Sequence, residues 1–185
     1  FDTNARMATD KFAFAINQRL PDDIRIQYSD EVEADWHPRK NDCIKTYTYR
    51  ILNRKIDIPT ERLYAHFCYF NLDVDKMREA SGYFIGTHDF TSFCSTKSDK
   101  DSKVRVVTKA EVKRNGDELI FTFEGKGFLY NMVRILVGTA LQIGDGLREV
   151  EEMKQILEAM DRNAAGPTAP AHGLYLDEVF YKNFD

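Results

Sequence analysis

The junction between a predicted hairpin and a predicted helix, residues 123–134, carries an arginine that could take part in chemistry. Gly125 and Gly127 allow the backbone to turn sharply here, because glycine tolerates conformations that other residues avoid. Arg134 lies one turn after Tyr130 and off the apolar stripe of the helix. A guanidinium in that position is adjacent to the core without being in it, which suits a catalytic role. The same spacing also suits an ordinary arginine whose stem covers apolar side chains while its head pairs with a surface acid.

Two other polar clusters could bind or act on a ligand. Lys126 lies between the two glycines and is a candidate phosphate contact, although a lone Gly-Lys-Gly is a weak signal. His88 and Asp89 lie in a small-and-aromatic segment, residues 86–93, with no matched serine or cysteine nucleophile. An Asx turn, in which the aspartate accepts hydrogen bonds from nearby backbone amides, is the favoured interpretation. The four histidines have no metal-ligand spacing, so no metal site is predicted.

Tyr47 and Tyr49 alternate on one side of a predicted strand, residues 44–51. Exposed aromatic rings beside Lys and Arg can stack on bases while the cations bind phosphates, but alternating tyrosines also occur in plain sheet packing. Residues 39–55 hold six Lys and Arg against one Asp, and residues 97–114 hold seven against three acids. Because the net charge is −4, the rest of the chain carries −13. This segregation fits RNA binding and fits a solvated pair of strands equally well.

A small α+β fold must position these residues. Hydrophobic periods of two and of 3.6 separate the strands from the helices. In order, residues 44–181 give β-α-β-β-α-(α)-β, which predicts a ferredoxin-like antiparallel sheet with helices on one face. Residues 86–103 are predicted to be irregular, and residues 166–173 to form a loop that only its neighbours can order. The predicted helices are 8–20, 73–85, 128–142 and 150–160; the predicted strands are 22–26, 44–51, 104–112, 119–123 and 174–181, with an Asn115-Gly116 hairpin turn.

Composition limits the class of protein. The chain has 185 residues, of which 43% are hydrophobic and 30% charged, so it is long enough to bury a core. Charged residues interrupt every hydrophobic stretch, and no apolar run is long enough to span a bilayer. The three cysteines are far apart and outside any C-x-x-C pair, which argues against a disulfide framework and favours a reducing, cytoplasmic setting.

Six strings, taken together, resemble the tRNA pseudouridine synthase A family in order and in spacing. No one string is specific, but they cover nearly the whole chain. They are Asn17-x-x-Leu20-Pro21-x-Asp23-Ile24, His37-x-Arg39, Lys45-x-Tyr47-x-Tyr49, Gly86-x-His88-Asp89-Phe90-Thr91-Ser92-Phe93, Gly125-x-Gly127-Phe128-Leu129-Tyr130-x-Met132-Val133-Arg134 and Ala169-Pro170-Ala171-x-Gly173-Leu174-x-Leu176.

The resemblance implies isomerisation of uridine to pseudouridine in the anticodon stem-loop of tRNA, with no metal and no cofactor. The family's catalytic aspartate lies in a Gly-Arg-Thr-Asp-Ala-Gly stretch that would precede Phe1, and no such stretch occurs in residues 1–185. The chain is therefore expected to be an N-terminally truncated form that is inactive alone. Residues 1–36 would be the remnant of the N-terminal catalytic subdomain, and residues 37–185 the C-terminal subdomain. Members of the family are homodimers, so a second copy and tRNA are the expected partners.

The resemblance also implies roles for individual residues. Arg134 would pair with the catalytic aspartate and keep it ionised. Tyr47 would stack on the target base and assist proton removal from its C5 atom. Phe128 and Leu176 would line the substrate pocket. The expected RNA contacts are Arg39, Lys40, Lys45, Tyr49, Lys126 and His88.

Two other classes of function share parts of this pattern. A non-catalytic RNA-binding module of the RRM type has the same element order, but its aromatic motif belongs on the third strand. Here Lys126-Gly127-Phe128 follows that strand, and Leu129 stands where the motif has glycine. A purely structural partner domain would show no salt-dependent binding of tRNA, whereas either RNA-binding class would lose affinity steeply with salt.

Overall fold

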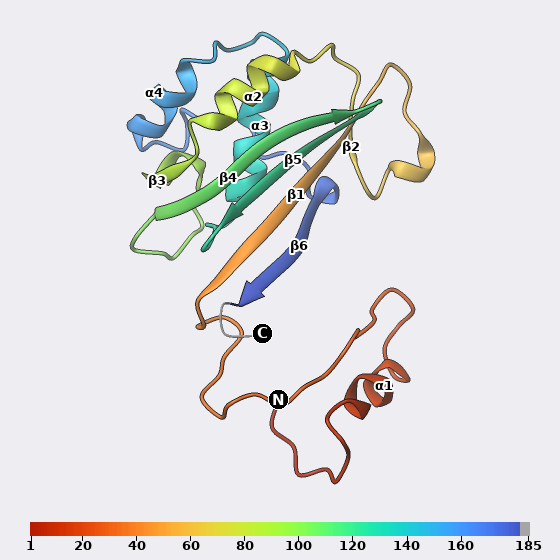
Figure 1. The fold of residues 1–185 in the computed structure, drawn as a ribbon. Coiled ribbons are helices and arrows are strands. Elements are labelled where there is room, and N and C mark those ends of the chain that lie inside the picture. The colour runs from red at the N-terminus through yellow and green to blue at the C-terminus, as the bar shows by residue number, and fades with distance from the viewer. Residues whose placement is uncertain (182–185) are drawn as a thin grey trace. The chain divides into compact units, whose positions relative to one another are not determined.

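The computed structural model of the chain describes residues 1–181 (Figure 1). The chain folds as two compact units, Phe1–Asn41 and Asp42–Asp185. The second unit contains the whole β-sheet and three of the four α-helices that the described residues form. No helix within residues 1–181 is both long enough and apolar enough to cross a membrane.

The first unit has one short helix, α1 (Lys11–Asn17), where a longer helix over residues 8–20 was predicted. The predicted strand at residues 22–26 is wrong, since these residues form no strand. The side chain of Asn17 makes the two hydrogen bonds to the Ile26 backbone that a partner strand would make. Its Nδ2 atom donates to the Ile26 carbonyl oxygen at 2.8 Å, and its Oδ1 atom accepts from the Ile26 amide, also at 2.8 Å.

The second unit is built on a sheet that has six strands within the described residues. The strand order is β2-β1-β5-β4-β3, and β6 pairs with the first part of β1 on the same side as β2. The strands are β1 (Cys43–Asn53), β2 (His66–Cys68), β3 (Gly86–Asp89), β4 (Val104–Asn115), β5 (Glu118–Gly125) and β6 (Leu174–Tyr181).

The order β6-β1-β5-β4 is that of the split βαβ unit, so the predicted α+β fold is confirmed. The three helices of the second unit lie on one side of its sheet (Figure 1). Two features depart from the prediction. β2 and β3 were missed, and β2 runs parallel to β1, so the sheet is not wholly antiparallel. The helices are α2 (Val74–Gly82), α3 (Met132–Gly144) and α4 (Glu152–Ala159), with short 3-10 turns at Pro59–Glu61, Thr91–Phe93 and Ala171–Gly173.

The core lies between the sheet and the helices. Leu119, Phe121 and Phe123 alternate along β5 and are fully buried against the helices, as their period of two predicts. Burial of one such side chain stabilises the fold by about 1.5–3 kcal/mol. From the helix side, Ile135 and Leu136 of α3 are equally buried in the same cluster, and α3 packs against β1 and α2.

Turns and caps place the ends of these elements. Asp73 caps α2 as predicted, and its carboxylate accepts from the amides of Asp75 and Lys76 at 3.1 and 3.0 Å. The hairpin loop is Gly116-Asp117, one residue later than predicted, because Asn115 still pairs with Glu118 and only the glycine takes positive φ (58°).

The helix α3 begins at Met132 and not at Phe128 as predicted. The reason is Asn131, which precedes the helix with φ 59° in the left-handed region. A residue in that conformation cannot continue a right-handed helix, and asparagine tolerates it better than most residues do.

Candidate functional site

Arg134, in the first turn of α3, is the cation around which the site is organised. Its Nε atom donates to the carbonyl oxygen of Ala169 at 2.6 Å, and its Nη1 atom donates to Oδ1 of Asn131 at 3.3 Å. The side chain is half-buried. Among the ion pairs formed within residues 1–181, none includes Arg134. The guanidinium is therefore aimed by its neighbours while donors remain available to an anion.

The loop that aims Arg134 is the segment 164–173, which we call the strap. The amide of Ala169 donates to the carbonyl oxygen of Arg134 at 3.0 Å, and the amide of Gly166 donates to Oγ1 of Thr139 at 2.9 Å. The approach is so close that a Cβ atom at Gly138 would lie 1.9 Å from the carbonyl oxygen of Pro167. The prediction that neighbours must order residues 166–173 is confirmed.

Tyr49 holds the strap from the side of the sheet. Its ring is fully buried, and its hydroxyl donates to the carbonyl oxygen of Pro170 at 2.7 Å. Burial raises the pKa of this hydroxyl strongly, while the charge of Arg134 acts in the opposite direction. Tyr49 and Arg134 are thus neighbours linked through Ala169 and Pro170. The Tyr49 ring belongs to the core in this structure, and an RNA contact for this residue stays a prediction.

Tyr47 lies two residues before Tyr49 and on the same face of β1. Its ring meets the ring of Phe128 edge-on, with 5.1 Å between centroids, and Leu176 of β6 lies directly opposite it. Tyr47 and Phe128 are half-buried, and Leu176 is 50% exposed. Tyr47, predicted to be catalytic, is therefore brought together with Phe128 and Leu176, predicted to line the pocket, and apolar surface is left open beside them.

The protonation state of Tyr47 limits its chemistry. Burial raises the pKa of its hydroxyl above the ordinary value of 10.0. The phenol therefore remains neutral at physiological pH, so it can donate or accept a hydrogen bond but does not act as a phenolate. The edge-on contact with Phe128 holds the ring of Tyr47 in place, and a planar base can stack on that ring.

Lys45 and Lys126 lie where β1 and β5 come together, near Tyr47. Lys45 lies two residues before Tyr47, on the same face of β1, and pairs in register with Gly125 of β5. Lys126 follows Gly125 and makes an exposed ion pair with Asp42 at 3.3 Å. Exposed pairs of this kind contribute little, about 0–1 kcal/mol, so an approaching phosphate can displace the carboxylate.

The structure does not bring His88 to this site. It lies on β3, three strands from β1, which is about 14 Å at the usual spacing between strands. Its Nε2 atom lies 3.0 Å from the carbonyl oxygen of Ile85. The neighbouring Asp89 accepts from the amide and the hydroxyl of Thr91 at 2.9 and 2.6 Å, so the predicted Asx turn is confirmed.

Arg39 and Lys40 belong to the first unit, Phe1–Asn41. Both are exposed, and their backbone amides bond to the ring and the carbonyl oxygen of His37 at 3.1 and 3.0 Å. Neither side chain takes part in an ion pair within residues 1–181. An RNA contact for these two residues stays a prediction.

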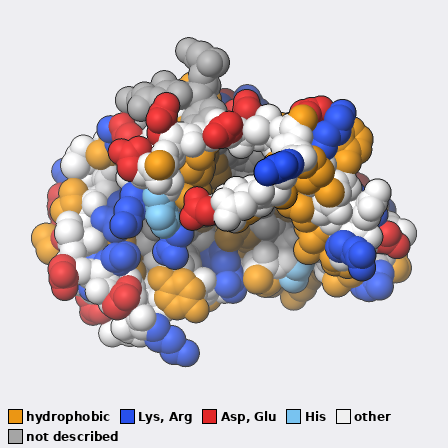
Figure 2. Space-filling model, turned by 90° about the horizontal axis from the view of Figure 1, so that it is seen from below, with side chains coloured by type: hydrophobic (Ala, Val, Ile, Leu, Met, Phe, Trp, Pro, Cys, Tyr) orange, Lys and Arg blue, Asp and Glu red, His pale blue; other side chains and the backbone are white. Residues whose placement is uncertain are grey.

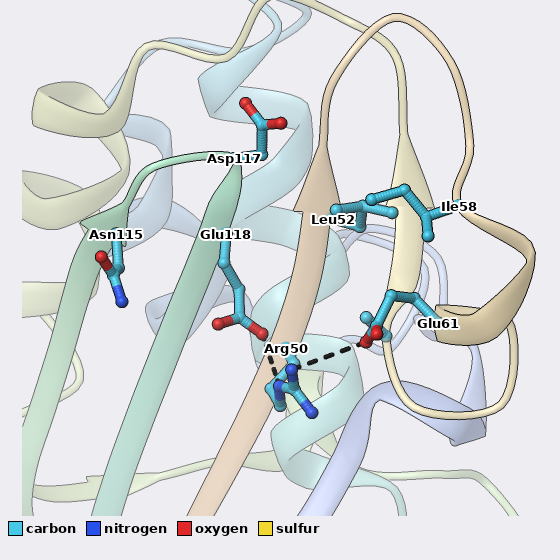
Figure 3. A pocket seen from close by; sticks show the side chains of 8 residues that line it. Arg50, Leu52, Ile58, Glu61, Asn115, Asp117 and Glu118 are labelled. Carbon is cyan, nitrogen blue, oxygen red and sulfur yellow. Dashed lines mark hydrogen bonds and ion pairs between the residues drawn. The ribbon is translucent and has the colours of Figure 1, made fainter.

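The basic segments are partly neutralised by acids on the open face of the sheet. Arg50 points toward two acids, with its Nε atom 2.5 Å from Glu118 and its Nη2 atom 3.7 Å from Glu61 (Figure 3). These residues line a pocket of about 260 Å³ together with Asn115 and others. Over the face drawn in Figure 2, basic and acidic side chains lie close together. Arg50 is thus a structural cation, unlike Arg134.

Two residues important for the geometry had no assigned role from the sequence. Asn131 both starts α3 and accepts from Arg134. Arg162 braces the strap, because its Nη1 atom donates to the carbonyl oxygen of Gly166 at 3.0 Å and its Nη2 atom to Oγ1 of Thr168 at 3.3 Å. The asparagine directly before an apolar helix was a usable signal for the first. No local pattern points to the second.

Comparison with known proteins identifies similar sequences. A family model described as tRNA pseudouridine synthase matches residues 80–182. A tRNA pseudouridine synthase A of Bacillus pumilus is 48% identical over 184 residues, covering 99% of this chain and 74% of that protein. The proteins of the same name from Brevibacillus brevis and an Exiguobacterium species are 46% and 45% identical, covering 98% and 100% of this chain and 74% of each relative.

Proposed function

This chain belongs to the tRNA pseudouridine synthase family. On that premise we propose that it is part of an enzyme that isomerises uridine to pseudouridine in the anticodon stem-loop of tRNA. In this reaction the bond between C1′ and N1 breaks and a bond between C1′ and C5 forms. The proton leaves C5, and N1 ends with a proton. Atoms and electrons balance within one nucleotide, so the chemistry needs no added reactant.

The observation that carries the proposal is the half-buried, aimed guanidinium of Arg134 without an acid among residues 1–181. A charge in such a place is stabilised by an opposite charge. We assign that role to an aspartate outside residues 1–185, in keeping with the lack of a Gly-Arg-Thr-Asp-Ala-Gly stretch in the sequence. The relatives extend beyond the matched part, since it covers 74% of the Bacillus pumilus protein. Residues 1–185 alone are accordingly proposed to be inactive.

Arginine suits this task better than lysine. Its planar fork can make two parallel hydrogen bonds to a carboxylate, and it remains charged at all accessible pH values. Such pairing lowers the pKa of the partner carboxylate and keeps it ionised in a closed pocket. The bonds to Ala169 and Asn131 fix the direction of the fork before any partner arrives.

Tyr47, Phe128 and Leu176 are proposed to receive the base. The target uridine must leave its stack to be reached, and an aromatic ring can replace part of the lost stacking. The neutral phenol of Tyr47 can then hold or pass a proton by hydrogen bonding while the C5 proton is removed. Lys45 and Lys126 lie beside this group and are proposed to contact phosphates.

The remaining proposals follow the family. Residues 1–36 are assigned to a catalytic subdomain and residues 37–185 to the second subdomain. The working enzyme is proposed to be a homodimer with tRNA as its partner, in the cytoplasm. The three cysteines, all buried and free in the described residues, suit a reducing compartment.

A non-catalytic RRM-like module fits the geometry less well. Such modules display aromatic rings on the open face of the sheet, where bases stack. Here Phe121 and Phe123 of β5 face the helices and are fully buried. The side chains of β5 that alternate with them toward the open face are Ile120, Thr122 and Glu124.

The test uses the full gene product and tRNA labelled with tritium at C5 of uridine, because isomerisation releases that tritium. Wild-type enzyme should release it, whereas residues 1–185 alone should not. Tyr47→Phe should lower kcat strongly, while Lys113→Gln, a surface change away from the site, should leave it unchanged. Full activity of residues 1–185 would remove the role given to an external aspartate.

A further inference from the structure

We propose that a second pocket, at the far end of β1, binds a nucleotide of the RNA substrate away from the reacting uridine. The pocket has a volume of about 470 Å³. The inference rests on the proposed function for the identity of the RNA. Its lining combines cations with exposed aromatic rings: Asn53, Arg54, Lys55, Tyr69, Phe70, Asn71, Leu72 and Arg114.

Asn53 organises the pocket. Its Nδ2 atom donates to the carbonyl oxygens of Cys68 and Phe70 at 3.0 and 2.8 Å, which fixes the segment that carries the aromatic rings. Its Oδ1 atom accepts from Nη2 of Arg114 at 2.8 Å, which fixes a guanidinium from β4. One side chain thus sets the position of the rings relative to the cation, so the pocket is ordered before a ligand arrives.

The aromatic part consists of Tyr69 and Phe70. Their ring centroids are 4.3 Å apart with 31° between planes, and the side chains are 62% and 50% exposed. Two large exposed rings side by side form an apolar surface that a soluble domain usually covers with a ligand or partner. A nucleobase can stack on such a surface whatever its identity, because every base has a π-face.

The cationic part favours an anion over an apolar partner. Arg54, Lys55 and Arg114 line the pocket, and the ion pairs within residues 1–181 neutralise only Arg54, through Asp117 at 3.5 Å. Arg114 uses part of its fork on Asn53 and keeps further donors. Rings for a base and cations for a phosphate, in one pocket, match the two halves of a nucleotide.

The pocket is too far from Tyr47 to serve the same nucleotide. Six residues of extended strand separate Tyr47 from Asn53, which is about 20 Å. A tRNA is long enough to engage both places, and a second contact adds affinity without changing the chemical step. The pocket is therefore expected to act on tRNA binding and not on kcat.

The test compares tRNA affinity and its dependence on salt for variants of the full gene product. Arg54→Gln with Arg114→Gln should weaken binding and lower the slope of log K against log salt by about one for each phosphate that the pocket no longer binds. Tyr69→Ala with Phe70→Ala should weaken binding about tenfold with the slope unchanged. Lys109→Gln with Lys113→Gln, a pair on β4 that binds Glu111, is the matched control and should change neither. In all three variants kcat at saturating tRNA should equal the wild-type value.

Affinity and slope equal to the control in both test variants would overturn the inference, as would a loss of kcat with affinity unchanged. Lys55 is exposed, so Lys55→Gln should fold even where the arginine double variant does not. It should also weaken tRNA binding and lower the salt slope, so the cationic part of the pocket can still be tested. A change of oligomeric state in place of tRNA affinity would assign the rings to a protein partner and would also overturn it. The proposed function fails separately, when wild-type enzyme binds tRNA but releases no tritium from C5.

Discussion

The hydroxyl of Tyr49 offers a one-atom test of how the strap is held. Tyr49→Phe keeps the buried ring and removes only the bond to the carbonyl oxygen of Pro170, which is 2.7 Å long. That carbonyl then loses this donor in part-buried surroundings, and loss of a partner by a polar group shielded from water costs about 1–3 kcal/mol. For a protein of this size, a loss of about 2 kcal/mol corresponds to a fall in Tm of about 4–8 °C.

Urea unfolding measures this change directly, as a shift of the midpoint at constant m-value. The matched control is Tyr175→Phe, because that hydroxyl also donates to a backbone carbonyl, of Tyr64 at 2.6 Å, but in exposed surroundings. Water can replace the lost bond there, so the expected cost is no more than about 1 kcal/mol. Equal destabilisation by the two changes would refute the account of the strap.

The same substitution should affect catalysis, because Pro170 follows Ala169, whose carbonyl oxygen holds Nε of Arg134. A looser strap should lower kcat while the affinity for tRNA stays unchanged. Tyr175→Phe should leave both quantities at the wild-type value. A loss of tRNA affinity in Tyr49→Phe, with kcat intact, would instead favour a direct RNA contact for this residue.

Two further outcomes follow from the packing. Gly138→Ala should lower the free energy of unfolding, measured in urea, by about 1–3 kcal/mol, because the added Cβ would lie 1.9 Å from the carbonyl oxygen of Pro167. The control is Gly82→Ala, whose added Cβ has nothing within 4 Å, and it should be neutral or stabilising. Burial, and then the charge of His172, lowers the pKa of His66 below 6.5, so the unfolded chain binds more protons between the lowered pKa and 6.5. Stability should therefore fall as pH drops from about 7 to about 5, and His66→Gln should flatten that part of the curve of unfolding free energy against pH.

The long elements of the second unit could be predicted because their signals are strong. Leu119, Phe121 and Phe123 alternate without interruption, and α3 carries a wide apolar stripe. The short strands β2 and β3 have three and four residues, too few for a period to emerge, and pairing with longer neighbours stabilises them. The strand predicted at residues 22–26 was wrong because this segment is also short. The side chain of Asn17 makes the hydrogen bonds to Ile26 that a partner strand would have made.

Part of the candidate site could be predicted from the sequence. Arg134, Tyr47, Phe128 and Leu176 were found from their strings, and the structure brings the last three into contact or register. The bond from Tyr49 to the strap was not predicted, because alternation along β1 shows only that Tyr49 lies on the same face as Tyr47. The distance between His88 and Tyr47 could not be predicted, because the order of strands in the sheet, which puts β3 at the far edge, depends on contacts between distant parts of the chain.

The central claim is that the fork of Arg134 holds a carboxylate, and Arg134→Lys in the full gene product tests it most directly. Lysine keeps the positive charge but cannot make two parallel bonds or keep the bond to Ala169 in place. The account predicts a fall in kcat of about a hundredfold, measured as tritium release from C5-labelled tRNA, with tRNA affinity close to wild type. A variant that retains the wild-type kcat would contradict it.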